Sequence, residues 1–156
     1  KSLQSLWTEI QLGESAINQN GHRLVRVVVA EVRRQPGGDK ILVELEQTLA
    51  DGRKRVRSQR PMAEKIIGQE SPQAALVRGL AEELDLQKSD YSILAHEPLI
   101  SKTSRMSGSY PGVMSQYERL IFQVVAPNLP LEDFTVVEPD GVRSATWGWR
   151  EPVPGE

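Results

Sequence analysis

The chain has 156 residues, of which 38% are hydrophobic and 26% charged, and this composition predicts one soluble globular domain spanning residues 1–156. The formal net charge of -2 excludes a chain-wide electrostatic match to nucleic acid or anionic lipid, so we expect any anion site to be a local patch. The absence of cysteine excludes disulfides and thiolate chemistry and fits a cytoplasmic or other reducing compartment. No apolar run is long enough to cross a membrane, and a start at Lys1 rather than at methionine is compatible with excision from a longer chain.

The first half of the sequence predicts strands joined by tight turns. Residues 2–21 are mixed and fit either a strand with a loop or a short helix. Residues 24–33 are rich in valine and predict a strand. Residues 40–49 predict a second strand because an apolar face alternates along them with a face that carries acidic residues. The pair Asp-Gly that follows favours a hairpin turn. Residues 53–59 then return as a third strand.

Residues 71–84 form the clearest predicted helix. Ser71 can accept a hydrogen bond from a free N–H group at the helix start, and Pro72 suits the first helical position because it has no N–H to satisfy. Apolar residues recur at helical spacing and predict a core-facing stripe. Its members are Ala74, Val77, Leu80, Ala81 and Leu84.

The second half predicts strands again, at residues 91–97 and 117–125. The polar segment between them, residues 101–115, is interpreted as a loop, either a lid over a ligand or a solvent-exposed connection. Residues 131–134 favour a short helical turn. The tryptophans of the aromatic segment 146–151, Trp147 and Trp149, are expected to pack in the core, and His96 is expected to be a structural residue.

The segment from Glu70 to Leu86, ESPQAALVRGLAEELDL, carries the strongest functional pattern. It resembles the Nudix box, in which a Gly is followed after five residues by Glu and, seven residues later, by Arg-Glu-apolar-any-Glu-Glu-any-Gly-apolar. The matching residues are Glu70, Arg78, Leu80, Glu82, Glu83 and Leu86. The departures are Glu64 at the first Gly, Ala63 before it, Gly79 in place of the Glu after the Arg, and Asp85 at the last Gly.

This resemblance implies an α/β fold, a Nudix-like α/β/α sandwich around a mixed β-sheet. Family members cut a diphosphate linked to another group, usually with Mg²⁺, which prefers carboxylates, waters and phosphates as ligands. The resemblance assigns Glu82 and Glu83 to the metal and gives Glu70 and Arg78 a structural role. Helical spacing predicts that Gly79, Glu82 and Glu83 project together from the face opposite the apolar stripe, so one of three metal-binding acids is missing. The competing interpretation is a solvated helix face.

One basic cluster accompanies the box, at Arg53, Lys54, Arg55, Arg57 and Arg60. Strand alternation predicts that Arg53, Arg55 and Arg57 share a face. They are candidate ligand-binding residues because guanidinium groups bind phosphate with two hydrogen bonds, and the alternative is an edge strand protected by charge. Lys102 and Arg105, from the predicted loop, are further candidates.

Three functions remain open at this point. The first is a non-hydrolytic Nudix-like domain that binds a phosphorylated, nucleotide-type ligand or a protein partner in a regulatory or assembly role. The second is a divergent Mg²⁺-dependent hydrolase of a nucleoside-diphosphate derivative, with a base from outside the box, at Glu118, Glu132, Asp133 or Glu138. The third is a module that binds the 5′ phosphate of RNA through the strand that carries Arg53, Arg55 and Arg57, here called the arginine strand. Its affinity for RNA should depend steeply on salt concentration. The sequence leaves the ligand and the oligomeric state open.

Overall fold

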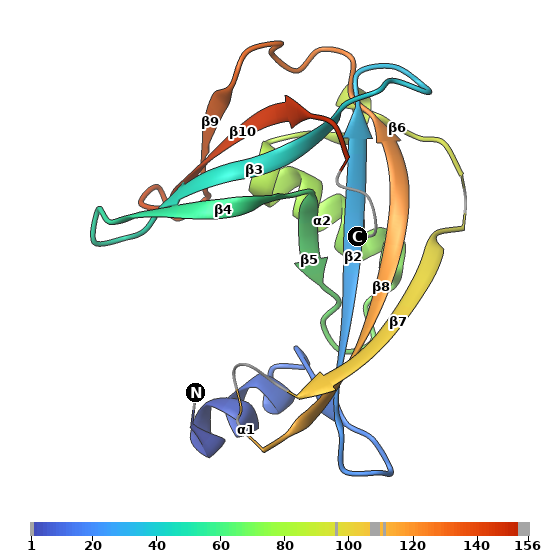
Figure 1. Cartoon of the computed structure of the whole chain (residues 1–156), viewed down its shortest axis with the longest axis vertical. Helices are drawn as coiled ribbons and strands as arrows, with labels where there is room; N and C mark the ends of the chain where they lie inside the picture. Colours follow the sequence, from blue (N-terminus) through green and yellow to red (C-terminus); the bar gives the residue numbers. More distant parts are fainter. Residues whose placement is uncertain (1, 96, 107–109, 111, 153–156) are drawn as a thin grey trace.

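A computed structural model describes residues 2–95, 97–106, 110 and 112–152, which form two β-sheets and two α-helices (Figure 1). His96 and part of the predicted loop, 107–109 and 111, lie outside the described residues. The helices are α1 (Leu3–Gln11), α2 (Pro72–Leu84) and the 3₁₀ helix η1 (Lys88–Asp90). The strands are β1 (Ala16–Ile17), β2 (Arg23–Arg33), β3 (Ile41–Thr48), β4 (Lys54–Arg60), β5 (Met62–Lys65), β6 (Ser92–Ile93), β7 (Leu99–Met106), β8 (Met114–Val125), β9 (Phe134–Val137) and β10 (Ser144–Arg150). None of the helices among these residues is long and apolar enough to cross a membrane.

The larger sheet is built around the parallel pair β2 and β8. Their register runs without interruption from Arg23 opposite Ser115 to Arg33 opposite Val125. All other pairings in this sheet are antiparallel: β1 and β5 pair with β2, and β6 and β7 pair with β8. The sheet is therefore mixed, and the predicted α/β class with a mixed sheet is confirmed.

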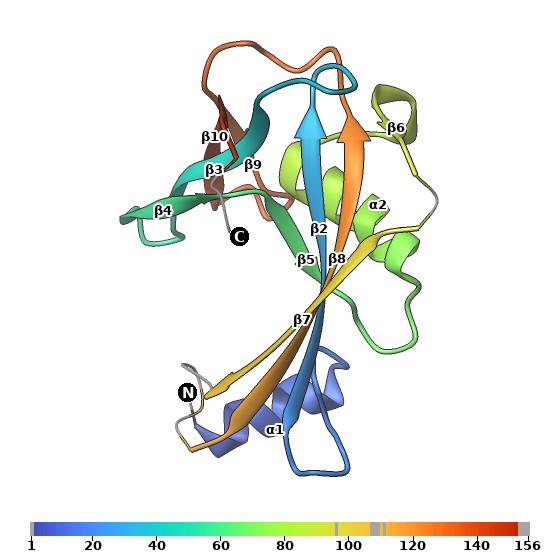
Figure 2. The same cartoon turned by 45° about the vertical axis from the view of Figure 1, so that its right-hand side comes forward.

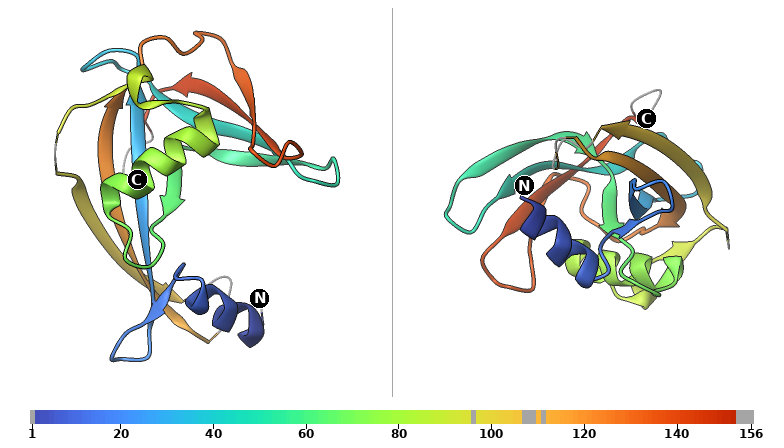
Figure 3. Two further views of the ribbon diagram at one scale, coloured as in Figure 1. Left: turned by 180° about the vertical axis from the view of Figure 1, so that it is seen from behind. Right: turned by 90° about the horizontal axis from the view of Figure 1, so that it is seen from below.

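The smaller sheet has four antiparallel strands in the order β4-β3-β10-β9. It lies at one end of the long strands β2 and β8, and α1 lies at the other end (Figures 1 and 2). Helix α2 packs against β5 and β2 and also touches β9, so it spans the junction of the two sheets (Figure 3, left view).

The core lies between α2 and the two sheets. Leu76 and Leu80 of α2 are fully buried, as are Phe122 of β8 and Trp147 of β10. Burial of one large apolar side chain contributes about 1.5 to 3 kcal/mol, so this cluster holds the helix at the junction of the sheets. Trp149 is also in the core cluster, which confirms the expected packing of both tryptophans.

The helix prediction is confirmed in its bounds and is wrong in part of its stripe. Leu80 and Leu84 are buried as expected, but Ala74 is exposed and Val77 is half-buried. The residues that pack inward in the first two turns are Ala75, Leu76 and Gly79. The buried face is rotated from the predicted one, and α2 contacts strands of both sheets, β5 and β2 of the larger and β9 of the smaller.

Three local predictions are corrected. Residues 101–106 belong to strand β7 and not to a loop, and residues 131–134 form no helix, since β9 begins at Phe134. The strand expected over 91–97 is limited to β6. Strand β7 was missed because both of its faces are largely exposed, so its sequence has no apolar alternation to reveal it. Of the two readings of residues 2–21, the short helix is the one that forms, as α1.

Candidate functional site

The box helix is fixed at both ends by its own sequence. The Ser71 side chain accepts a hydrogen bond from the Ala74 N–H at 3.1 Å, and Pro72 occupies the first turn. The helix ends at Asp85, which adopts the left-handed conformation with φ of 55°. This is the position at which the box pattern has Gly, the residue that adopts such angles without steric cost. Asp85 therefore adopts a backbone conformation that would also suit a Gly at this position.

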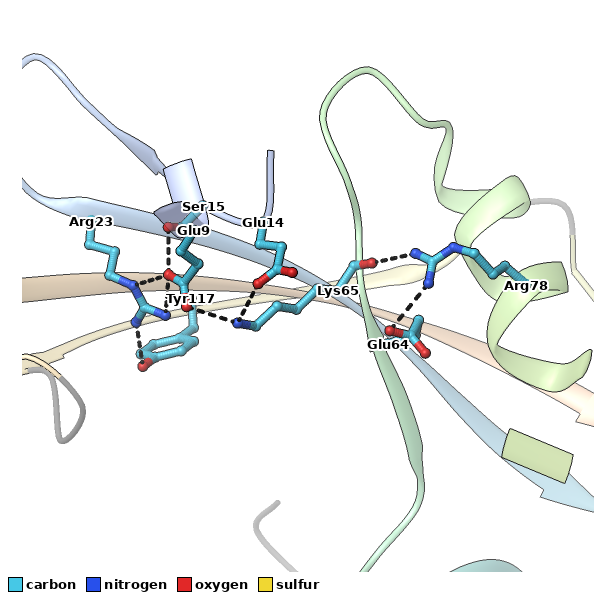
Figure 4. Close-up of polar contacts among 8 residues, drawn as sticks. All are labelled: Glu9, Glu14, Ser15, Arg23, Glu64, Lys65, Arg78 and Tyr117. Atoms are coloured by element: carbon cyan, nitrogen blue, oxygen red, sulfur yellow. Dashed lines mark hydrogen bonds and ion pairs between the residues drawn. The ribbon is translucent and has the colours of Figure 1, made fainter. Parts of the chain in front are cut away.

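Arg78 organises the acids around the start of α2. It donates two hydrogen bonds to the Glu70 carboxylate, from Nε at 3.1 Å and from Nη2 at 2.9 Å. Nη2 also donates to the Lys65 carbonyl at 2.8 Å, and Nη1 lies 3.3 Å from the Glu64 carboxylate (Figure 4). Glu82 lies further from Nη1, at 3.9 Å. The hydrogen bonds from Arg78 hold the pKa of Glu70 below its usual value. The arginine therefore ties the loop, β5 and α2 together.

Glu64 and Gly79, two of the departures from the box, face each other in space. A Cβ atom on Gly79 would lie 3.0 Å from the Glu64 Cβ and 3.1 Å from both Sδ and Cε of Met62. Gly79 is buried, so it does not project to solvent beside Glu82 and Glu83 as helical spacing predicted. The pattern has Gly at position 64 and Glu at position 79, and this chain has the reverse. The exchange moves one carboxylate from the helix to the adjoining strand.

The two box acids that remain differ in environment. The Glu82 side chain is 49% exposed, whereas Glu83 is half-buried. Burial, together with the negative charges of Glu64, Glu138, Glu44 and Glu82, raises the pKa of Glu83 to about 7. These carboxylates come from α2, β3, β5 and the residue after β9, so the tertiary structure brings them together. Such a site favours the uptake of a proton or a cation.

A metal ion implied by the resemblance fits this site only in part. Carboxylate oxygens are the donors that Mg²⁺ prefers. However, Glu64 is paired with Arg78, and among the residues that the structure describes no group of three or more His, Cys, Asp or Glu side chains is placed to hold a metal ion. Glu82 and Glu83 can supply two carboxylates, and a ligand phosphate would have to complete the coordination.

The predicted ligand-binding cations do not converge. Arg53 is paired with Asp51, and Arg57 donates to the buried carboxylate of Glu44 at 2.7 Å, whereas Arg55 is exposed. Because Arg53 and Arg57 are engaged by acids, the arginine strand does not present three free guanidinium groups to an RNA phosphate. Lys102 and Arg105 lie on β7 of the other sheet, with Arg105 stacked on the Tyr117 ring at 4.6 Å.

Two acids of this site, Glu44 and Glu138, were not singled out as members by the sequence. Glu44 follows three buried apolar residues of β3 and is itself buried, with Arg57 and Gln47 as partners. An acid at the end of a run of buried strand residues is a signal that could have found it, because such a carboxylate needs partners. Glu138 was named only as a candidate base and gave no comparable signal.

A second polar cluster, which shares Lys65 with the contacts of Arg78, anchors α1. The Glu9 carboxylate is buried and accepts hydrogen bonds from Arg23 Nε at 3.0 Å and from the Ser15 hydroxyl at 2.6 Å, and Lys65 lies 3.2 Å away (Figure 4). Burial by itself raises the pKa of Glu9, but the hydrogen bonds from Ser15 and Arg23 and the nearby positive charges outweigh it and lower the pKa to about 2. This carboxylate is fully engaged, so its role is to join α1 to β2 and β5.

Comparisons with known proteins leave the family open. Neither the scan against protein-family models nor the search of curated proteins gives a match. Among solved structures, the crystal structure of C. elegans Ap4A hydrolase is similar over 82% of this chain and 80% of that chain, with 16% sequence identity and a TM-score of 0.46. A likeness of this size supports no argument about activity, so the relation to Nudix proteins continues to depend on the residues of the box.

Proposed function

We propose that this chain is a Nudix-like domain that binds a phosphorylated, nucleotide-type ligand without hydrolysing it efficiently. One observation carries the proposal. The helix position that supplies a metal-binding acid in the box pattern is Gly79, packed against β5, and the carboxylate nearest to it, Glu64, is paired with Arg78. Both features reduce the negative charge available to a catalytic metal and to the activation of water.

Binding remains compatible with the acids that are left. Mg²⁺ is often held by one or two carboxylates together with substrate phosphates. Glu82 and Glu83 would hold it here, and the bound ion would supply positive charge for the diphosphate of the ligand. The salt bridges of Arg78 with Glu70 and Glu64 join α2 to the loop before it and to β5.

The test compares binding with turnover for one set of ligands. The protein is titrated with ADP, ADP-ribose and a dinucleoside polyphosphate, with and without Mg²⁺, by calorimetry, and the same mixtures are assayed for released phosphate-containing products. We expect Mg²⁺-dependent binding that Glu83→Gln weakens, with little product. Rapid turnover that Glu83→Gln abolishes would refute the non-hydrolytic proposal, and the absence of binding to all three would refute the ligand class.

The alternative is a divergent Mg²⁺-dependent hydrolase, and the environment of Glu83 favours it. The pKa of Glu83 is raised to about 7 by burial and by the carboxylates around it, a crowding of negative charge that a bound cation would relieve. This alternative predicts measurable turnover that increases when the third acid is restored. Because Glu64 occupies the space beside Gly79, the restoring variant is the exchange Glu64→Gly with Gly79→Glu, and Gly79→Glu alone is its matched control. No increase over the wild type with the exchanged pair would count against it.

A further inference from the structure

Strand β7 has a long free edge. All eight of its residues, from Leu99 to Met106, pair with β8 in an uninterrupted antiparallel register. No other strand pairs with β7 within the described part of the chain, so the backbone N–H and C=O groups on its outer side have no strand partner. Every residue of β7 except Ser101 is exposed. A regular edge of this length is a template for one more strand.

The edges of the other strands are shorter or distorted. The pairing of β4 with β3 contains a register shift, and Gln59 of β4 has a positive φ of 53°. The sequence of β4, KRVRSQR, is also strongly basic. The strands β1, β5, β6 and β9 have no more than four residues each. Bulges, clustered charge and short length are the devices that prevent strand addition. Strand β7 has no bulge and no proline, and its two charges, Lys102 and Arg105, are not adjacent.

We propose that two copies of this chain associate through antiparallel pairing of their β7 strands about a two-fold axis at Thr103. The two-fold axis that relates two antiparallel strands is perpendicular to the sheet, so each residue and its copy point to the same face. Directly opposed residues also point to the same face, so the residue at the axis must lie opposite its own copy. Within β7, the two longest such pairings are centred on Lys102, which uses residues 99–105, and on Thr103, which uses residues 100–106.

The side chains select the pairing centred on Thr103. A centre at Lys102 sets two lysines directly opposite, and opposed like charges destabilise a sheet. A centre at Thr103 sets Thr103 against the partner's Thr103, and Lys102 against the partner's Ser104. It also sets Ile100, which is 54% exposed, against the partner's Met106, which is 55% exposed in the single chain. Two apolar contacts are thus buried, and no charged residue faces a like charge.

Cysteine cross-linking tests this register directly, because the natural chain contains no cysteine. Thr103→Cys places the two introduced thiols on the symmetry axis, where opposed residues have Cα atoms about 4.5 to 5.5 Å apart, within disulfide reach. Lys102→Cys is the matched control, since its two copies would be about 8 Å apart in the proposed pairing, too far without backbone movement. Mild oxidation should give covalent dimers for Thr103→Cys much faster than for Lys102→Cys. The reverse order, or equal rates, would overturn the register.

A charge exchange provides a second test, by sedimentation at increasing protein concentration. Ile100→Glu and Met106→Lys should each weaken dimers, whereas the double variant forms two Glu–Lys pairs across the axis and should bind about fivefold more tightly than either. Val56→Glu on β4, an exposed apolar site outside the interface, should have no effect. Circular dichroism checks that each variant folds. A wild type that stays monomeric throughout, or a double variant weaker than both singles, would overturn the proposal and leave the edge available to a different extended chain.

Discussion

The contact between Gly79 and β5 makes Gly79→Ala the most informative single change in the box helix. In an open helix, replacement of Gly by Ala stabilises by about 1 kcal/mol, because alanine loses less backbone entropy on folding. Here the added Cβ would lie 3.0 Å from the Glu64 Cβ, which is closer than the optimum of about 3.5 to 4.0 Å between carbon atoms. Overpacking of this kind costs about 1 to 3 kcal/mol. We therefore expect a net destabilisation of about 1 kcal/mol.

Two substitutions at position 64 separate the steric effect from the charge. Glu64→Ala removes the ion pair with Arg78 but keeps the Cβ, so Gly79→Ala should remain destabilising in that background. Glu64→Gly removes the Cβ as well, and the flexible end of Met62 can then move, so Gly79→Ala should become neutral or stabilising. The coupling between positions 64 and 79 should be about 1 to 2 kcal/mol with Glu64→Gly and near zero with Glu64→Ala.

Urea unfolding followed by tryptophan fluorescence measures these free energies, since Trp147 is buried in the core. The natural protein and the three variants of each cycle are compared at one pH, and the comparison requires that the m-value does not change. If Gly79→Ala stabilises the natural protein by about 1 kcal/mol, the glycine is not required by the close approach of β5. The proposed exchange of Glu and Gly between strand and helix would then have no steric basis.

Three further results are expected. Glu9→Gln should destabilise the fold by about 3 kcal/mol in urea unfolding, because it leaves Arg23 buried without its counter-charge. In the natural protein the pKa of Glu9 is lowered to about 2, so the stabilisation from its carboxylate is present above pH 4.5 and should be lost as pH falls from 4.5 to 2. Asp85→Gly should raise the free energy of unfolding by about 1 kcal/mol, because φ at this residue is 55° and Gly adopts this left-handed conformation without steric cost. A lower urea concentration at the midpoint of unfolding would contradict this. The raised pKa of Glu83, about 7, means that the folded state holds its proton more tightly than the unfolded state, so the free energy of unfolding should fall as pH rises from 4.5 to 7. Glu83→Gln should remove this fall and be more stable than the natural protein at pH 8. If Glu83→Gln shows the same pH dependence as the natural protein, the acid cluster is refuted.

Local signals in the sequence predicted the elements that depend on local chemistry. The valines of β2 favour a strand and the Ser71-Pro72 start of α2 favours a helix through local chemistry, and both elements form as expected. The rotation of the buried face of α2 was not predictable, since it depends on packing against strands from distant parts of the chain. The strand β7 was not predictable either, because it is held by backbone pairing with β8 on one side while its side chains remain exposed.

The candidate site joins residues of the box to residues from other elements. The resemblance to the box gave Glu70 and Arg78 a structural role, and in the structure these two side chains are hydrogen-bonded to each other. Spacing on a helix does not show what packs against it, so the burial of Gly79 and the approach of Glu64 were not foreseen. The same holds for Glu44, which reaches the cluster from a sheet formed by distant parts of the chain. Charge clusters built from several elements leave no periodic trace in the sequence.

The parallel pairing of β2 with β8 has a consequence for synthesis of the chain. Every residue of β2 pairs with one 92 positions later, as Arg23 does with Ser115. During translation, β2 therefore cannot pair with β8 until most of the domain has been synthesised. Contacts of such long sequence separation also form slowly. Truncation before residue 114 should yield a nascent chain that exposes the valines of β2, which makes an incomplete translation product prone to aggregate or to be captured by a chaperone.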